Sequence, residues 1–405
     1  MNQTATITPK LRINSIDALR GFALIGILLL HCMEHYDFSF RPTLESPFWI
    51  KVDTIVQDTL YFLFAGKSYA IFSLLFGLSF FMMMDSQAEK GNDFRLRFLW
   101  RLVLLFVLGY INGLVYMGEF FMVYATLGIL LIPLYKVPGK VLVLLSILLF
   151  LQIPQVIDFI SLLTSDPSNS GSRSELSRKM GLLYRESANT YANGSFLDVL
   201  RFNLLKGQIA KMLWVINVYR YLQLIGLFIA GMLIGRSGIY KDPNKMVYWC
   251  KKILPYAIGC FLFFYVISWL LPYFGIEKRR LLRAGTELLK IYGNLGMMMM
   301  YICGFILLYY KTIKGRKFLD ILAPVGRMSV TNYMMQSVMG VLAFYPFGLG
   351  LAKQSFLICF LIGLLLCFFQ VWYSNWWIKR YYYGPMEWLW RTCTWFKKIP
   401  MKRKD

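Results

Sequence analysis

Residues 14–35 read NSIDALRGFALIGILLLHCMEH, and this stretch decides how the rest of the chain is interpreted. An unbroken apolar run occupies positions 21–30, with polar residues on both sides of it. Asn14 can cap a helix that starts there, and Asp17 stands three residues later, where a capping-box acid belongs. No small-residue cleavage site follows the run, so we expect a retained first transmembrane helix and not a signal peptide.

Two functional groups mark the ends of this expected helix. Arg20 and His31 lie eleven positions apart, which is three helical turns plus about 20°, so both side chains fall on one face about 16 Å apart. A bilayer core is about 30 Å thick. This face therefore carries a cation near one interface and a titratable base toward the other.

The composition is that of a polytopic membrane protein. Of the 405 residues, 58% are hydrophobic and only 16% are charged, whereas a soluble domain carries about 25% charged residues. We therefore expect an all-α bundle of transmembrane helices in a lipid bilayer. The net charge of +23 fits anchoring at the inner leaflet, and no basic–aromatic module indicates that the chain binds nucleic acid.

Hydropathy predicts about ten spans of roughly 17 or more mostly apolar residues. They cover roughly residues 16–34, 55–84, 98–117, 119–136, 140–161, 212–235, 250–272, 288–310, 323–345 and 355–378. We expect one membrane domain with a first helical half at 12–161, an outer loop at 162–211, a second half at 212–392 and a basic tail at 393–405. The outer loop could form a small helical cap.

The charged residues of the connections predict the topology. Lys and Arg gather at 85–97, 236–249 and 311–322 and in the C-terminal tail. The positive-inside rule then favours both termini in the cytoplasm. Two outer segments, 162–211 and 278–283, carry positive charge against this trend.

Polar residues inside the spans are candidates for function, because they are costly to bury in a membrane. Lys67 falls near the middle of the second span, where it either pairs with Glu119 or Asp58 or meets a substrate. Glu119 itself lies at a tight outer turn, where a carboxylate is often simply solvated.

A polar stripe marks the ninth span. Ser329, Asn332 and Gln336 recur at positions i, i+3 and i+7, so they share one helical face. Hydrogen bonds between helices, worth about 1 kcal/mol each, would explain the stripe. The alternative is the polar wall of a substrate cavity, to which Tyr333 would also contribute.

The chain has two histidines, His31 and His35, one helical turn apart. Glu34 could join them as a third metal ligand, but no HExxH pattern accompanies them. The seven cysteines are scattered and show no CxxC spacing. We therefore expect no metal, and we interpret His31 as a general base, because the unperturbed pKa of an imidazole is near 6.5.

Four motifs, in this order, resemble those of the YeiB-like family of bacterial inner-membrane proteins, whose C-terminal half is a domain of unknown function. They are Ser15-Ile16-Asp17-Ala18-Leu19-Arg20-Gly21, Gly66-Lys67 with Phe72-Ser73-Leu74-Leu75-Phe76-Gly77, Gly326-Arg327-Met328-Ser329 with Asn332-Tyr333 and Gln336-Ser337, and Gly384-Pro385-Met386-Glu387-Trp388-Leu389-Trp390-Arg391. The likeness covers nearly the whole chain. It implies a multi-pass protein of the bacterial cytoplasmic membrane.

YeiB-like proteins are more distantly similar to two groups of transmembrane acyltransferases, the acyltransferase-3 group and the heparan-glucosaminide N-acetyltransferase group. Acyltransferase-3 proteins carry a basic residue, ten intervening residues and a histidine in the first helix, and Arg20 and His31 fit that spacing. They also carry an arginine pair in the first inner loop, thought to meet the acyl-CoA phosphates. Arg95, Arg97 and Arg101 lie in that loop here, although without a strict RxxR.

This resemblance implies a site for acyl transfer. An acyl-CoA such as acetyl-CoA would be the donor substrate, with no bound cofactor, and Arg20 and the loop arginines would meet its phosphates. Asp17 and Lys67 are further candidates for binding substrate. His31 would take the proton of the acceptor and Glu34 could orient it. Asn332, Ser329 or Tyr333 would stabilise the oxyanion, and Gln336 would line the substrate cavity.

We therefore expect transfer of an acyl group from a cytoplasmic acyl-CoA to a hydroxyl or amine acceptor of the envelope, either a glycan or a lipid. A transporter or flippase is the first alternative, since Lys67, Glu119 and the stripe at Ser329 could line a pathway. The second is a non-catalytic member of the same fold, because many YeiB-like sequences carry Asn at the position of His31. The sequence does not identify the acceptor or the oligomeric state.

Overall fold

A computed structural model describes residues 13–37, 46–164, 172–274 and 279–403, and in these residues the chain is all-α, as the sequence predicts. The first half contains α1 Asn14–Met33, α2 Pro47–Phe64, α3 Ser68–Ala88, α4 Arg95–Val115, α5 Phe121–Gly128, α6 Leu131–Leu134, α7 Gly139–Phe150 and α8 Ile153–Thr164. The middle contains α9 Ser172–Asn193, α10 Phe196–Phe202, a π-helix at Asn203–Gly207 and α11 Gln208–Asn217. The second half contains α12 Arg220–Ser237, α13 Pro243–Leu270, α14 Arg279–Lys311, α15 Ile313–Asp320, α16 Ala323–Arg327, α17 Ser329–Phe344, α18 Phe356–Arg380 and α19 Pro385–Trp395.

The described residues contain seven helices or helix pairs that are long and apolar enough to cross a membrane, or eight if a bent pair counts as one span. The bent pair joins Phe196–Asn217 to Arg220–Ser237 at 75°. Ten spans are therefore not confirmed. The expected span at 119–136 is divided into the short helices α5 and α6, and the one at 323–345 is divided into α16 and α17.

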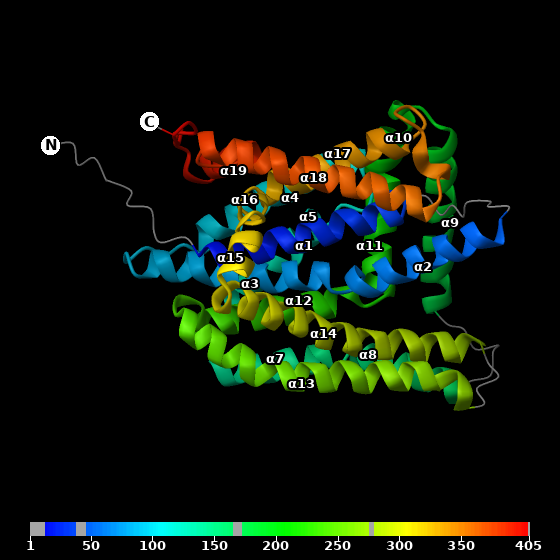
Figure 1. Ribbon diagram of the computed structural model, residues 1–405, viewed down its shortest axis with the longest axis horizontal. Helices are drawn as coiled ribbons and strands as arrows, with labels where there is room; N and C mark the ends of the chain where they lie inside the picture. Colours follow the sequence, from blue (N-terminus) through cyan, green and yellow to red (C-terminus); the bar gives the residue numbers. More distant parts are fainter. Residues whose placement is uncertain (1–12, 38–45, 165–171, 275–278, 404–405) are drawn as a thin grey trace.

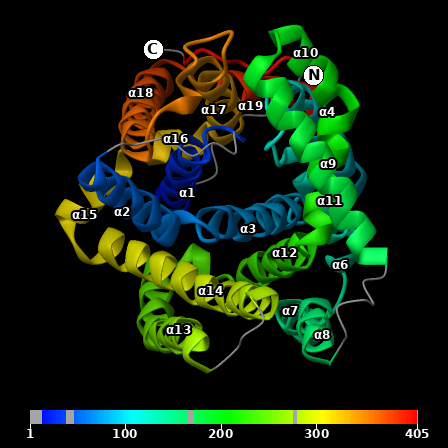
Figure 2. The same ribbon diagram turned by 90° about the vertical axis from the view of Figure 1, so that its right-hand side faces the viewer.

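The helix α1 lies at the centre of one layer, where it contacts α2, α3, α16, α17 and α18 (Figure 1, Figure 2). Two glycines bring its backbone against that of α16. A Cβ atom at Gly21 would lie 2.2 Å from the carbonyl oxygen of Leu322, and one at Gly326 would lie 1.8 Å from that of Asp17. Any larger residue at either position would push these two helices apart.

The start of α1 differs in detail from the expectation. The helix begins at Asn14, but Ile13 is the N-cap and no side chain caps the helix. Asp17 is not part of a capping box, because its carboxylate pairs with Arg20 Nη1 at 3.0 Å. Asp17, the first charged residue of the helix, therefore holds the side chain of Arg20.

A second layer lies on the far side of α3 and α12. It consists of α7, α8, α13 and α14 (Figure 2). Among the candidate spans, the hydrophobic window of α13 is the least buried, at 6%, and α14 makes most of its contacts. Apolar and aromatic side chains such as Leu262, Phe263 and Trp269 are exposed on it. This surface suits contact with lipid, as expected for a multi-pass membrane protein.

Basic residues gather at one end of the bundle, which we call the basic end. Here α1, α4 and α13 begin and α3, α12, α14 and α18 end (Figure 1). Its connections carry Lys90, Arg95, Arg97, Arg236, Lys241, Lys245, Lys311, Lys314, Arg316, Lys317, Lys379 and Arg380. The opposite end, where α1 and α4 finish, is called the far end.

Candidate functional site

Two cavities lie within the bundle and share one wall. The first has a volume of about 220 Å³ and lies toward the basic end, and the second has about 590 Å³ and lies toward the far end. Phe72, Phe121 and Tyr124 line both of them. These three rings form an aromatic wall between two spaces of very different chemistry.

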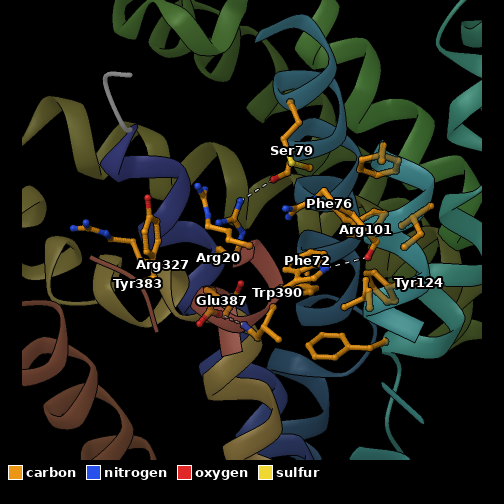
Figure 3. A pocket seen from close by; sticks show the side chains of 18 residues that line it. Arg20, Phe72, Phe76, Ser79, Arg101, Tyr124, Arg327, Tyr383, Glu387 and Trp390 are labelled. Carbon is orange, nitrogen blue, oxygen red and sulfur yellow. Dashed lines mark hydrogen bonds between the residues drawn. The ribbon is translucent and has the colours of Figure 1, made fainter. Parts of the chain in front are cut away.

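The cavity toward the basic end is called the basic cavity, because four arginines line it. Arg20 comes from α1, Arg101 from α4 and Arg327 from α16 (Figure 3). Arg391 comes from α19. Glu387 is the one acidic residue in its lining. Helices from both halves of the chain therefore bring positive charge to one place.

Two of these arginines show how the cavity is organised. Arg20 donates to the hydroxyl of Ser79 on α3 at 2.9 Å, in addition to its pair with Asp17. Arg101 is 8% exposed, its guanidinium stacks 4.0 Å over the ring of Trp390, and its Nε has no hydrogen-bond partner. A buried guanidinium with an unsatisfied N–H is prepared to meet an anion.

The presence of an acid, Glu387, in the lining of the basic cavity has a structural reason. Its carboxylate accepts hydrogen bonds from the backbone N–H groups of Val330 and Thr331, at 2.5 and 3.1 Å, and from the hydroxyl of Thr331 at 2.6 Å. It thus satisfies the free N–H groups at the start of α17. Because Glu387 fixes α19 to α17, it also places Arg391 beside the cavity.

The cavity toward the far end is called the histidine cavity. His31 is 16% exposed, and its Nδ1 lies 2.9 Å from the hydroxyl of Tyr116 and 3.4 Å from Oε2 of Glu34. Both contacts use the same ring nitrogen, so Nε2 is the nitrogen left to act on a ligand. If Nδ1 carries the proton, Nε2 is a base.

The chain leaves α1 through an unusual turn that shapes this cavity. His35, Tyr36 and Asp37 have φ values of 50°, 52° and 73°, which is the left-handed region that non-glycine residues rarely adopt. The turn directs Asp37 into the cavity, where its Oδ2 is buried without a hydrogen-bond partner. Burial, with Glu34 nearby, raises the pKa of Asp37 to about 7.

The same turn separates the two histidines. His35 lies beyond the end of α1, its Nε2 contacts the carbonyl oxygen of Gln354 at 3.1 Å, and its ring packs against Phe356. The i,i+4 geometry of a two-histidine metal site is therefore not formed. No group of three or more His, Cys, Asp or Glu side chains suited to a metal occurs among the residues that the structure describes.

A buried ion pair lies on the other side of the histidine cavity. Lys211 Nζ lies 3.3 Å from Oε2 of Glu119, and both side chains are at most 3% exposed. Glu119 also accepts from the backbone N–H of Phe121, so it is neither solvated nor paired with Lys67. Lys211 lies in the first turn of α11, directly after the π-helix.

Some residues of the polar stripe of α17 bind neighbouring helices, and others line the cavities. Asn332 donates to Ser374 and to the carbonyl oxygen of Val325, both at 2.9 Å, and Gln336 donates to Gln370 at 2.8 Å. These bonds tie α17 to α16 and α18, and neither residue lines a cavity. Ser329 lines the basic cavity and Tyr333 the histidine cavity.

Three basic residues that were candidates for substrate binding lie outside both cavities. Lys67 is 4% exposed and donates to the carbonyl oxygen of Phe62 at 2.6 Å. Arg95 binds Asp93 on the surface. Arg97 donates to the carbonyl oxygen of Thr394 at 2.8 Å. Of the three loop arginines, the structure thus brings only Arg101 to a cavity.

Comparisons with known proteins place this geometry in a family. Residues 234–397 match the family model described as "Protein of unknown function (DUF418)". Residues 234–397 thus belong to the DUF418, or YeiB-like, family. The matched residues run from the end of α12 to the end of α19, and thus include Arg327, Tyr333 and Arg391.

Relatives extend the family likeness to the whole chain. The uncharacterized protein YxaH of Bacillus subtilis is 27% identical over 97% of this chain and 96% of its own length. The uncharacterized 39.9 kDa protein in the amylase 3′ region of Bacillus acidopullulyticus is 26% identical over the same shares, and the uncharacterized protein YeiB of Escherichia coli is 25% identical over 94% and 95%. No solved structure matches the chain.

Sequence reasoning missed several residues that line the cavities of this protein. Arg327 and Arg391 stand inside the quoted motifs and could have been chosen as charged residues next to helix ends. No sequence pattern points to Asp37, Tyr116 or Arg220 as functional residues. They reach the cavity only because of the turn after α1, the end of α4 and the bend before α12.

Proposed function

We propose that this protein is a membrane acyltransferase, which moves an acyl group from a cytoplasmic acyl-CoA to a hydroxyl or amine of an envelope glycan or lipid. The observation that carries the proposal is the pair of cavities, one cationic and one holding a base, that meet at a shared aromatic wall. Arg20 and His31 lie at the two ends of α1, about 16 Å apart along its axis. A pantetheine arm has about this reach.

The distribution of charge supports an orientation with the basic end in the cytoplasm, since the positive-inside rule favours it. Both termini then lie on the cytoplasmic side, and the basic cavity faces the compartment that contains acyl-CoA. Arg20, Arg101, Arg327 and Arg391 would hold the phosphates of the donor through charge-assisted hydrogen bonds. The donor is a substrate, so the proposal includes no resident cofactor.

The histidine cavity supplies the groups for the chemical step. Nε2 of His31 takes the proton of the attacking hydroxyl or amine, while Glu34 and Tyr116 hold Nδ1. The attacking atom forms a bond to the thioester carbonyl carbon. The C–S bond then breaks, and the protonated imidazole returns its proton to the departing thiolate.

Tyr333 is the best candidate for stabilising the oxyanion of the intermediate. Its hydroxyl oxygen accepts the backbone N–H of Phe120 at 3.1 Å, so its own proton remains available to a ligand in the cavity. Asn332 and Ser329 were the other candidates, but the amide of Asn332 is used between helices and Ser329 lines the basic cavity. The proposal therefore assigns this role to Tyr333.

The test uses inverted membrane vesicles and radiolabelled acetyl-CoA, with the label followed into lipid and glycan fractions. We expect transfer by the wild type, no transfer by His31→Ala and weaker donor use by Arg101→Gln. Arg201→Gln, which removes a surface arginine, is the matched control and keeps full transfer. The proposal is contradicted if His31→Ala transfers as much label as the wild type, or if folded wild-type protein transfers none from acetyl-, succinyl- or long-chain acyl-CoA.

A transporter or flippase is the second candidate, and one observation favours it. The pair α11 and α12 is bent by 75° beside the histidine cavity, and broken helices at a central site are typical of secondary transporters. Flux of a substrate across vesicles without acylation would support this function. Neither activity in a folded protein would favour a non-catalytic member of the fold.

A further inference from the structure

Arg220 is a cation in the histidine cavity that the proposed chemistry does not use. It is the first residue of α12 and follows Tyr219, whose φ of 52° forms the corner of the bent pair. Its guanidinium stacks over the rings of Tyr69 and Trp214, with centroids at 4.6 and 5.4 Å, and donates to Tyr69 and Gln223. Three neighbours, Tyr69, Trp214 and Gln223, thus hold the guanidinium in one orientation.

The charge of Arg220 has no acidic partner among the residues that the structure describes. Across the described ranges of the chain, no carboxylate forms an ion pair with it, although ten other ion pairs occur there. Lys211, which lines the same cavity, differs from Arg220 in having an acidic partner, because Oε2 of Glu119 lies 3.3 Å from its Nζ. A cation at a membrane site normally has a partner, since an isolated charge is costly there.

The surroundings add to the positive potential. The helices α3 and α12 are packed together, and both begin beside this residue, α3 at Ser68 and α12 at Arg220 itself. Neither start has a side-chain cap. Unsatisfied N–H groups at helix starts favour negative charge, so the field at this part of the cavity acts in the same direction as the guanidinium.

We infer that the ligand of the histidine cavity carries an oxyanion, a phosphate or a carboxylate, that pairs with Arg220. The lining of this cavity of about 590 Å³ includes the acids Glu34 and Asp37 near His31, and many aromatic rings, which suit the uncharged part of such a ligand. If this ligand is the acyl acceptor, the inference rests on the proposed function. The inference that the cavity binds an anion holds whether the ligand is acylated or transported.

The experiment measures the thermal unfolding midpoint of the purified full chain in detergent, without any acyl donor. The probes are glycerol 3-phosphate and glycerate, with glycerol as their neutral counterpart, and dioctanoyl phosphatidic acid, with dioctanoylglycerol as its counterpart. The first set tests a free head group and the second a lipid. We expect at least one anionic probe to raise the midpoint of the wild type more than its neutral counterpart does.

The variants assign the effect to this residue. Arg220→Gln is expected to bind that anionic probe about tenfold more weakly or worse, because it loses charge-assisted hydrogen bonds, while binding of the neutral probe stays unchanged. Arg220→Lys keeps the charge and part of the preference, which also covers the case in which Arg220→Gln does not fold. Arg201→Gln removes the same charge from an exposed helix and keeps the full preference.

Three results would overturn the inference: equal stabilisation by anionic and neutral probes, an unchanged preference in folded Arg220→Gln, or no binding of any anionic probe. Because the assay contains no acyl-CoA, its outcome is independent of acyl transfer. A preference for anions in a protein that transfers no label would leave the inference standing and reject the proposed function.

Discussion

The carboxylate of Glu34 lies 3.4 Å from Nδ1 of His31, one helical turn along the chain. In the proposed mechanism this carboxylate fixes the ring so that Nε2 is the base. Glu34→Gln keeps the size of the side chain but cannot stabilise the protonated ring. We expect acyl transfer to fall by roughly tenfold to a hundredfold, less than the loss of about 10²–10⁴ for a missing general base.

Initial rates at saturating acetyl-CoA would measure this effect, with the KM for acetyl-CoA unchanged. Tyr116→Phe serves as the comparison, since it removes the other partner of Nδ1. An unaltered rate in Glu34→Gln would show that the carboxylate has no part in the reaction.

Two arginines from the same helix are predicted to behave differently. Arg101 lines the basic cavity, whereas Arg95 is bound to Asp93 on the surface. Arg101→Gln should raise the KM for acetyl-CoA at least tenfold with a smaller change in kcat, because it removes a contact with the donor phosphates. Arg95→Gln should leave both constants unchanged. Equal effects of the two substitutions would place the donor elsewhere.

The ion pair of Lys211 and Glu119 should matter for stability. Removing one partner of a buried pair leaves the other charge uncompensated, at a cost of about 3–5 kcal/mol. We therefore expect Lys211→Met to destabilise the protein strongly and the double variant with Glu119→Gln to recover part of that loss. Chemical unfolding in detergent would measure both, and strictly additive losses would contradict the pairing.

Asp37 should make stability depend on pH. Its pKa is raised from 3.8 to about 7 by burial and by Glu34, while His31, Lys211 and the N–H of Gly118 oppose the shift. The folded state therefore holds the proton more tightly than the unfolded state. This contribution to stability is complete below about pH 4 and decreases as the pH rises to about 7.

Asp37→Asn should remove this dependence. The variant is expected to unfold at a higher temperature than the wild type at pH 8, with the difference becoming smaller toward pH 5. Asp93→Asn is the control, because Arg95 holds the pKa of Asp93 at about 2, and it should show no such trend. A constant difference between Asp37→Asn and the wild type from pH 5 to pH 8 would contradict the assignment.

The sequence predicts the long helices well and the broken ones poorly. The position of α1 agrees with the expectation to within two residues, because an apolar run between charged groups has one stable arrangement in a membrane. The second span was expected as one long segment, yet the chain breaks at Gly66, whose φ is 81°. Hydropathy does not distinguish a continuous apolar helix from two helices that meet at an angle. The described residues hold seven or eight candidate spans, and the expected ten are not confirmed.

The candidate site was predictable where its residues share a helix. Arg20 and His31 follow from the periodicity of α1, and each lines a different cavity. Contacts between distant segments leave no periodic signal. The meeting of Tyr69 with Arg220, 151 positions apart, is such a contact, and so is the bond of Glu387 to α17.

The wall between the two cavities has a consequence for the cell. Phe72, Phe121 and Tyr124 line both spaces, so in the proposed mechanism a slender chain would pass between these three rings. The same rings would then be the barrier that keeps protons and ions from crossing along the path. If the protein transfers acyl groups in this way, the ion gradients of the membrane would depend on three aromatic side chains.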